Sequence, residues 1–298
     1  MTSLVEIYRR FPTKEAALAH LERVRWPDGP HCPQCGADTV ARKAEGGQRD
    51  RLQCWSCERS FSATVGTIFH NSHIDLQRWF LLIALMLNAK KGLSAMQAAR
   101  DLEMRRPTVW SMMHRIRGAM ADDGKLLTGL VEMDEAYVGG KPRRTNRKDD
   151  NDPKPRGRGT SKTPVVGAVE RGGRVKVKAV HKSDMTTDDM EAFTRETVDC
   201  STSSVTTDEY SSYNTLNNFV QHRRVNHSIA YVEYDLFGAA HTNTIESFWA
   251  ILKRAITGQF HHVSRKYLPL YLREIAYRYN MRLQGCDLDG LLHLAVKP

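Results

Sequence analysis

The stretch "LVEMDEAYV", Leu130 to Val138, decides how the second half of this chain folds, because it is typical of a β-strand that carries acidic residues. Successive side chains of a strand point to opposite faces of the sheet. Asp134 is therefore expected on the face opposite Val131, whereas Glu135 shares the face of Val131. The two acids of the Asp134–Glu135 pair are thus expected on opposite faces of the sheet.

A second strand with an acidic end is expected at "VTTDEYSSY", residues 205–213. In both stretches an aspartate, Asp134 or Asp208, stands three residues after a valine. If the two strands are parallel neighbours, these aspartates converge at one place, and Glu135 and Glu209 point away from it.

A third carboxylate is expected on a helix at residues 241–256, "HTNTIESFWAILKRAI". Asn243, Glu246 and Lys253 lie on one stripe of this helix, beside an apolar face that includes Trp249. Together with the two aspartates, Glu246 would supply the convergent carboxylates that Mg²⁺ prefers. Two such ions could activate the attacking oxygen and stabilise the leaving oxygen of a phosphodiester. Spacing alone leaves open that all three acids are simply solvated.

The remaining segments of this half predict a mixed α/β domain. Residues 163–182 alternate around a Gly172–Gly173 turn and predict a hairpin, while residues 186–198 and 268–282 predict helices. Residues 141–162 hold nine Lys or Arg and three Asp, which is typical of a flexible basic loop. This loop could bind phosphates or be a solvated insertion.

Four of the six cysteines predict a zinc site in the first half of the chain. Cys32 and Cys35 form one C-x₂-C pair, and Cys54 and Cys57 form another after 18 intervening residues. This spacing is typical of a closed four-thiolate site, in which one Zn²⁺ stabilises a ribbon and performs no chemistry. Whether such a ribbon binds DNA or protein stays open.

Two short helices are expected after the ribbon, at residues 93–102 and 107–120, joined by a tight turn. Apolar residues such as Val109 form one face of the second helix, and we expect Arg115 and Arg117 to point outward. The pair resembles a helix-turn-helix, whose second helix can enter the major groove. An ordinary helical hairpin with a solvated basic face fits the same pattern.

The composition is that of a folded soluble protein with a strongly basic balance. The net charge is +10 and 41% of residues are hydrophobic, which excludes a disordered chain and favours a polyanionic partner. Nucleic acid is the simplest such partner, although anionic membrane surfaces remain possible. The N-terminus has no apolar signal segment, and the longest apolar run, residues 79–87, is too short to span a membrane. We therefore expect a cytoplasmic, nucleoid-associated protein without a membrane partner.

From about Phe11 to Arg282 the chain resembles the zinc-ribbon DDE transposases of bacterial insertion sequences, the ISXO2-like group. The resemblance rests on long phrases in the same order: "RWPDGPHCPQCG", "GTIFHNSHIDLQRWF", "GLSAMQAARDL", "MDEAYVGG", "TDEYSSY", "HTNTIESFWAILKR" and "GQFHHVSRKYLPLYLREIAYRYN". It implies an RNase H-like catalytic domain in which Asp134, Asp208 and Glu246 form the DDE triad.

The resemblance also implies a mechanism and partners. Two Mg²⁺ or Mn²⁺ ions held by the triad would support cleavage at the terminal inverted repeats, and the freed 3′-OH would attack target DNA. Lys253 and the loop arginines Arg143 and Arg144 would contact phosphates, as would Arg115 and Arg117 on the predicted recognition helix. Asn243 either supports Glu246 or only starts the helix. The active assembly is expected to be a homo-oligomer on DNA.

The expected architecture is α+β with several domains. An N-terminal helical segment (1–27) precedes a zinc ribbon (28–70), a helix-turn-helix domain (71–124) and the RNase H-like catalytic domain (125–298). The leading interpretation is an active transposase. A catalytically inactive or domesticated DNA-binding protein on the same scaffold is the alternative. A zinc-ribbon transcription regulator would explain only residues 1–120.

Overall fold

The computed structural model describes residues 3–43, 51–139, 162–225, 233–235, 238–282, 285 and 287–297. The chain divides into two compact units, Met1–Met120 with Gly285–Pro298, and Ala121–Gln284. Each unit is described by itself. The expected loop at 141–162, including Arg143 and Arg144, lies almost wholly outside the described residues.

The first unit combines a small sheet with six helices in the part of the chain that the structure describes. The strands are β1 (Val40–Arg42), β2 (Leu52–Cys54) and β3 (Ser60–Phe61), paired antiparallel in that order. The helices are α1 (Leu4–Arg10), α2 (Lys14–Arg25), α3 (Leu76–Asn88), α4 (Ala95–Asp101), α5 (Arg106–Ala119) and α9 (Leu288–Ala295).

Helix α3 forms the centre of the first unit because it is apolar on nearly all sides. Its buried residues include Trp79, Phe80 and Ile83. Within the described residues, no helix combines the length and apolarity that crossing a membrane requires. Helix α9 packs with α2, α3 and α5. The structure thus groups it with the first unit, whereas the sequence-based division assigned residues 125–298 to one domain.

The second unit is built on a five-stranded sheet in the order β6-β5-β4-β7-β8. Its strands are β4 (Leu130–Val138), β5 (Thr163–Glu170), β6 (Val175–Ala179), β7 (Ser204–Thr207) and β8 (Gln221–Arg224). Strand β5 is antiparallel to its neighbours β4 and β6, whereas β7 is parallel to both β4 and β8. Val131 pairs with Val205, so the two acidic strands are parallel neighbours, which is the condition for the expected convergence of their aspartates.

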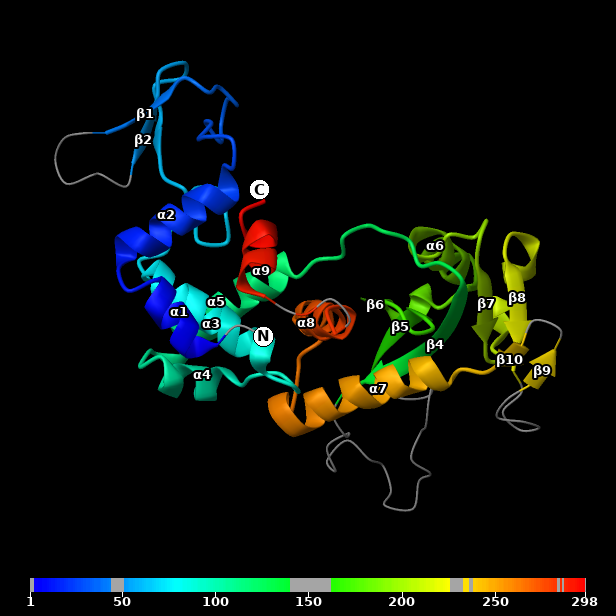
Figure 1. Cartoon of the computed structure of the whole chain (residues 1–298). Coiled ribbons are helices and arrows are strands. Elements are labelled where there is room, and N and C mark those ends of the chain that lie inside the picture. Colours follow the sequence, from blue (N-terminus) through cyan, green and yellow to red (C-terminus); the bar gives the residue numbers. More distant parts are fainter. Residues whose placement is uncertain are drawn as a thin grey trace. The chain divides into compact units, whose positions relative to one another are not determined.

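Helices cover both faces of this sheet (Figure 1). Helix α6 (Thr187–Thr197) contributes to the core on the face of Val131 and Met133. Helices α7 (Asn243–Ala255) and α8 (Leu268–Asn280) form the core on the face of Ala136. Alternation along β4 therefore places Glu132 and Asp134 on the α7 face. A five-residue π-helix, Ile256–Phe260, extends α7, and β9 (Glu233–Asp235) and β10 (Gly238–Ala240) form a separate antiparallel pair.

Candidate active site

Three carboxylates meet where β4 and β7 run side by side. Oxygens of Asp134, Glu135 and Asp208 all lie within 4.8 Å of one another, a spacing at which they could share a metal ion. The predicted convergence of Asp134 and Asp208 is therefore present in the structure. Glu209, by contrast, is exposed and is not part of this group.

The expectation that Glu135 points away from the two aspartates is wrong. Its carboxylate accepts a 3.4 Å hydrogen bond from the hydroxyl of Tyr213, which belongs to the core on the α6 face, as alternation predicts. However, β7 ends at Thr207, so Asp208 lies beyond the strand. The alternation of side chains along β7 therefore does not determine the direction of the Asp208 side chain. A strand-based rule therefore cannot separate Glu135 from Asp208.

The site is short of positive charge. Burial and, after it, the neighbouring charges of Glu135 and Asp208 together raise the pKa of Asp134 to about 7, although hydrogen bonds from the Glu135 backbone and from Trp249 act in the opposite direction. Three negatively charged carboxylates this close would repel one another strongly in the absence of a cation. The site therefore favours either a shared proton or a divalent metal ion.

Trp249 fixes the orientation of the Asp134 carboxylate. Its Nε1 donates a 3.0 Å hydrogen bond to Asp134 Oδ2 from the second turn of α7. Gly167 pairs with Asp134 on the neighbouring strand and leaves room for the indole ring. A Cβ atom at Gly167 would lie 2.6 Å from Cη2 of Trp249, closer than real contacts allow. Glycine is thus required here by the approach of the tryptophan.

Glu246 does not join the three carboxylates in the described part of the chain. It lies exposed in the first turn of α7, where its Oε1 accepts a 3.3 Å hydrogen bond from Thr242. Asn243 is the first residue of the helix, and Lys253, near its end, is exposed. The structure thus brings together two of the three predicted acids and places the third on the helix that contacts Asp134.

Glu132 is a functional candidate that the sequence reasoning did not consider. Its side chain has no exposed surface, and it accepts hydrogen bonds from Arg171 on one side and from the first turn of α7 on the other. Nδ1 of His241 also lies 3.2 Å from Glu132 Oε1. Alternation could have found this residue, because Glu132 shares the face of Asp134.

The four predicted zinc ligands also come together, in the first unit. The sulfur atoms of Cys32 and Cys57 lie 3.6 Å apart, as do those of Cys35 and Cys54, and all four lie within 4.8 Å of one another. Zn–S bonds of about 2.3 Å in a tetrahedron require sulfur atoms about 3.8 Å apart, so the cluster fits one zinc ion.

The protonation of these thiols agrees with a metal site. Burial opposes ionisation of Cys32, but the backbone N–H groups of Cys35 and Gln34 outweigh it and lower the pKa to about 7. At Cys57 the backbone N–H of Arg59 acts against burial and the neighbouring thiols, which together raise the pKa to about 12. The pKa is lowered at Cys32 and Cys54 and raised at Cys35 and Cys57, and a bound Zn²⁺ would favour the thiolate form of all four.

Residues 126–280 match the family model of the ISXO2-like transposase domain, which covers half of the chain. The chain belongs to this family. Residues 12–60 match the transposase zinc-ribbon domain, which confirms the predicted ribbon. The family resemblance inferred from the sequence phrases is thereby confirmed.

One curated relative of this chain comes from Halobacterium salinarum (strain ATCC 700922 / JCM 11081 / NRC-1), an uncharacterised protein in transposable element ISH50. The two are 30% identical over 172 residues, which cover 55% of this chain and 57% of the relative. The chain thus spans little more than half of the length of that protein.

Two solved structures with some likeness are complexes of Mos1. The Mos1 strand transfer complex is 12% identical with a TM-score of 0.28, covering 73% of both chains. The Mos1 transposase paired-end complex with the left transposon end is 13% identical with a TM-score of 0.22, covering 66% of this chain and 74% of that one. TM-scores this low do not establish a shared fold.

The two arginines of α5 that are predicted to contact DNA have different surroundings. Arg117 is only 1% exposed, so the expectation that it points outward is wrong. It lies one turn after Met113 and one turn before Met120, which places it on the buried stripe of α5. Arg115 is exposed, but its Nη1 donates to the carbonyls of Ile68 and His70 at 3.0 and 2.8 Å.

Two arginines that the sequence reasoning passed over are better placed. Arg105 and Arg106 are exposed at the start of α5. In a helix-turn-helix, residues at the N-terminal end of the recognition helix are those that reach base edges. The sequence indicates this position, because both arginines directly precede Pro107, and proline is common in the first turn of a helix.

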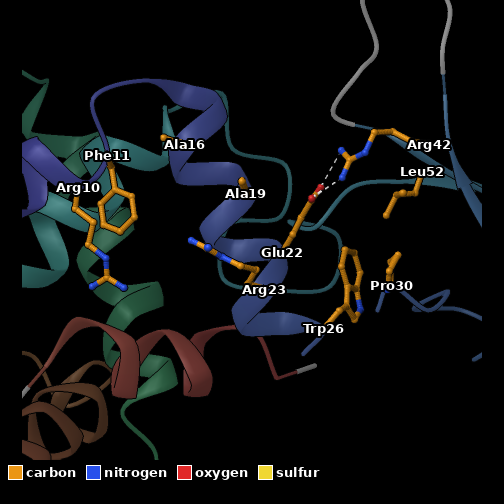
Figure 2. A pocket seen from close by; sticks show the side chains of 10 residues that line it. All are labelled: Arg10, Phe11, Ala16, Ala19, Glu22, Arg23, Trp26, Pro30, Arg42 and Leu52. Carbon is orange, nitrogen blue, oxygen red and sulfur yellow. Dashed lines mark hydrogen bonds and ion pairs between the residues drawn. The ribbon is translucent and has the colours of Figure 1, made fainter. Parts of the chain in front are cut away.

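The first unit also contains a groove of about 480 Å³ between α2 and the ribbon strands (Figure 2). Three arginines and Trp26 contribute to its lining. Arg42 is paired with Glu22 at 2.6 Å, and Arg10 with Asp289 at 2.7 Å. Because two of the three guanidinium groups already have carboxylate partners, we assign no ligand to this groove.

Proposed function

We propose that this chain is a DNA transposase whose second unit is an RNase H-like catalytic domain. It would cleave insertion-sequence ends and join the 3′-OH to target DNA by metal-dependent phosphoryl transfer. The observation that carries the proposal is the meeting of Asp134, on β4, with Asp208, directly after the adjacent parallel strand β7, within a family of transposases. The order of three antiparallel strands followed by parallel ones supports the RNase H-like assignment.

Asp134 and Asp208 would hold the metal, with Glu246 as the third predicted ligand and Glu135 as a further one. Two bound Mg²⁺ or Mn²⁺ ions would activate the attacking oxygen and stabilise the leaving oxygen. The donor set fits hard cations, since it consists of carboxylate oxygens only. Trp249 donates to Oδ2 of Asp134 and would hold this carboxylate in place for the metal ion.

The remaining residues of the site would act on the DNA backbone. Lys253 is exposed two turns after Glu246 on the same helix, where its ammonium group could contact a phosphate next to the reacting one. In-line attack requires that the DNA be held in place, and phosphate contacts supply that positioning.

We further propose that the first unit recognises the terminal inverted repeats. Helices α4 and α5 pack against each other and would form the helix-turn-helix, with Arg105 and Arg106 at the DNA. The zinc ribbon would be a structural element beside it, in the order of domains expected from the sequence. The net charge of +10 favours binding of DNA, and a homo-oligomer could hold two ends at once.

The test is Mg²⁺-dependent cleavage and strand transfer on an oligonucleotide that carries the inverted repeat flanking the gene. Wild type should be active, and Asp208→Ala should lose activity by several orders of magnitude. Glu209→Ala is the matched control, because Glu209 is adjacent but exposed and outside the carboxylate group. Equal activity of Asp208→Ala and wild type would refute the catalytic assignment.

A second pair of variants ranks the other two acids. We expect Glu246→Ala to abolish activity and Glu135→Ala to reduce it clearly more than Glu209→Ala does. If wild type binds the repeat tightly but neither cleaves nor joins it with Mg²⁺ or Mn²⁺, the chain is instead a domesticated DNA-binding protein on this scaffold.

A further inference from the structure

Glu132 is a fully buried carboxylate that binds the beginning of helix α7. It lies on β4 with no exposed side-chain surface. Its Oε2 accepts the backbone N–H groups of Thr244 and Ile245 at 2.7 and 3.0 Å, and its Oε1 accepts the Thr244 hydroxyl at 2.8 Å. Arg171 Nε donates to the same Oε1 at 2.7 Å and balances the charge.

This arrangement replaces the cap that helix α7 lacks. The first N–H groups of a helix have no partner inside the helix, and a side chain at the N-cap commonly accepts one of them. The N-cap residue of α7, Thr242, makes no such hydrogen bond. Glu132 accepts two of these N–H groups from another element, and its negative charge suits the positive end of the helix dipole.

Arg171 extends the connection to the segment before the helix. It follows β5 directly, and its Nη2 donates to the backbone carbonyl of His241 at 3.0 Å. The guanidinium group therefore joins Glu132, on β4, to the last residues before α7. A carboxylate without exposed surface is costly unless it is paired and hydrogen-bonded in this way, so the group resists any shift of one element relative to the other.

Helix α7 is thus bound to strand β4 at two points on the same face. Glu132 binds Thr244 and Ile245 in the first turn, and Asp134 binds Trp249 in the second. Glu246 lies between these two points along the helix. Two attachments fix both the position of a helix along its axis and its rotation, and together they determine where Glu246 projects.

We propose that Glu132 is a positioning residue, which holds Glu246 in place relative to Asp134 and Asp208 without touching metal or DNA. The proposal rests on the function proposed above. Residues that orient the ligands of a metal site from outside typically change metal affinity or activity 10- to 100-fold when mutated. We expect an effect of this size at Glu132.

The experiment compares Glu132→Gln with Glu274→Gln in the full chain. Glu274 is also a glutamate without exposed side-chain surface, and it pairs with Arg278 one turn away on α8. Both variants remove one buried ion pair of the second unit, but only Glu132→Gln replaces the acceptor of the α7 N–H groups by an amide. The Mg²⁺ concentration for half-maximal cleavage should rise 10- to 100-fold in Glu132→Gln only. Equal effects of both variants would overturn the proposal.

Hydrogen exchange gives a readout that does not need activity. The amides of Thr244 and Ile245 should exchange at least tenfold faster in Glu132→Gln than in wild type, and Glu274→Gln should leave them unchanged. Unchanged protection in Glu132→Gln would overturn the proposal. If wild type itself does not cleave DNA, the proposed function fails, while this measurement still decides whether Glu132 holds the helix.

A milder variant serves if Glu132→Gln does not fold. Thr244→Val removes the hydroxyl donor to Glu132 and keeps the charge and the shape, whereas Thr244→Ser keeps the donor. A rise in the Mg²⁺ requirement in Thr244→Val that Thr244→Ser does not show would support the proposal. Identical behaviour of the two variants would contradict it.

Discussion

Replacing Gly167 by alanine should displace Trp249 and so disturb Asp134. The added Cβ would lie 2.6 Å from Cη2 and 2.9 Å from Cζ2 of Trp249, and 3.2 Å from Cγ1 of Val177. Trp249 is only 3% exposed, so its ring has no solvent to move into. Since a contact below 3.0 Å cannot persist, the ring must shift by several tenths of an ångström. That shift strains its 3.0 Å hydrogen bond to Asp134.

The magnitude follows from two contributions. Overpacking a well-packed core costs about 1–3 kcal/mol, and a hydrogen bond to a charged group contributes about 1.5–3 kcal/mol, of which only a part is lost. We therefore expect the free energy of unfolding to fall by about 2–4 kcal/mol. The hydrogen bond from Trp249 also lowers the pKa of Asp134, so its loss should raise that pKa further and weaken the binding of a divalent cation at a given pH.

A double-mutant cycle in urea identifies the cause. Phenylalanine at position 249 lacks the two ring atoms that the new Cβ would contact, so Gly167→Ala should cost much less in the Trp249→Phe background. Coupling between touching residues is typically about 0.5–3 kcal/mol. Gly258→Ala is the control, because its Cβ would meet nothing within 4 Å. If Gly167→Ala costs the same in both backgrounds, contact with Trp249 is not the cause.

Four further predictions concern Asp134, the zinc site and two arginines of α5. The Asp134 pKa is raised from 3.8 to about 7, so in Mg²⁺-free protein this group contributes stability that is complete below about pH 4 and lost as the pH rises through 7. At about 1.4 kcal/mol per pKa unit, the loss is at most roughly 4 kcal/mol. Urea titrations from pH 4 to 8 should show it in wild type and not in Asp134→Asn. Cys54→Ser should lose the bound zinc by metal analysis and destabilise the ribbon, and retention of one full zinc equivalent would contradict the four-thiolate site. Arg106→Ala should weaken binding to the terminal repeat by about 1–3 kcal/mol and relax its sequence specificity without affecting folding, as measured by binding to the repeat and to a scrambled duplex. Arg117→Ala should instead lower the unfolding free energy by about 1–3 kcal/mol, because it empties a buried site.

The sequence predicted those features that depend on spacing within one segment. The two C-x₂-C pairs specify their own geometry, and the structure brings the four sulfur atoms together. Likewise the equal spacing of valine and aspartate in the two strands predicted that the aspartates converge if the strands are parallel neighbours, and Val131 does lie opposite Val205. In both cases the regular geometry of a knuckle or a strand converts sequence distance directly into spatial distance.

Features that depend on where regular structure ends were not predictable in this way. Strand alternation predicted that Glu135 points away from the two aspartates. Asp208, however, lies beyond the end of β7, where alternation no longer determines the direction of a side chain, and its carboxylate lies close to that of Glu135. Likewise, no local sequence pattern predicts that α9 packs with α2 and α3, because this packing joins parts of the chain that are far apart in sequence. Arg117 is a different case, because helical periodicity does place it on the buried stripe. The charge of the side chain predicts an exposed residue, whereas its position on the helix predicts a buried one, and the position decides.

Glu132 shows how the structure separates two acids that the sequence treats alike. Glu132 and Asp134 stand two residues apart on the same face of one strand, and both contact α7. Glu132 is fully buried and surrounded by donors, so no position on it is open to a metal ion. Asp134 accepts a single side-chain hydrogen bond among those described here and lies beside two further carboxylates that raise its pKa. A carboxylate whose charge is fully compensated by the protein can only hold structure, whereas one whose charge is left uncompensated requires a proton or a cation. The same strand face thus carries one acid suited to position the helix and another suited to bind the metal ion.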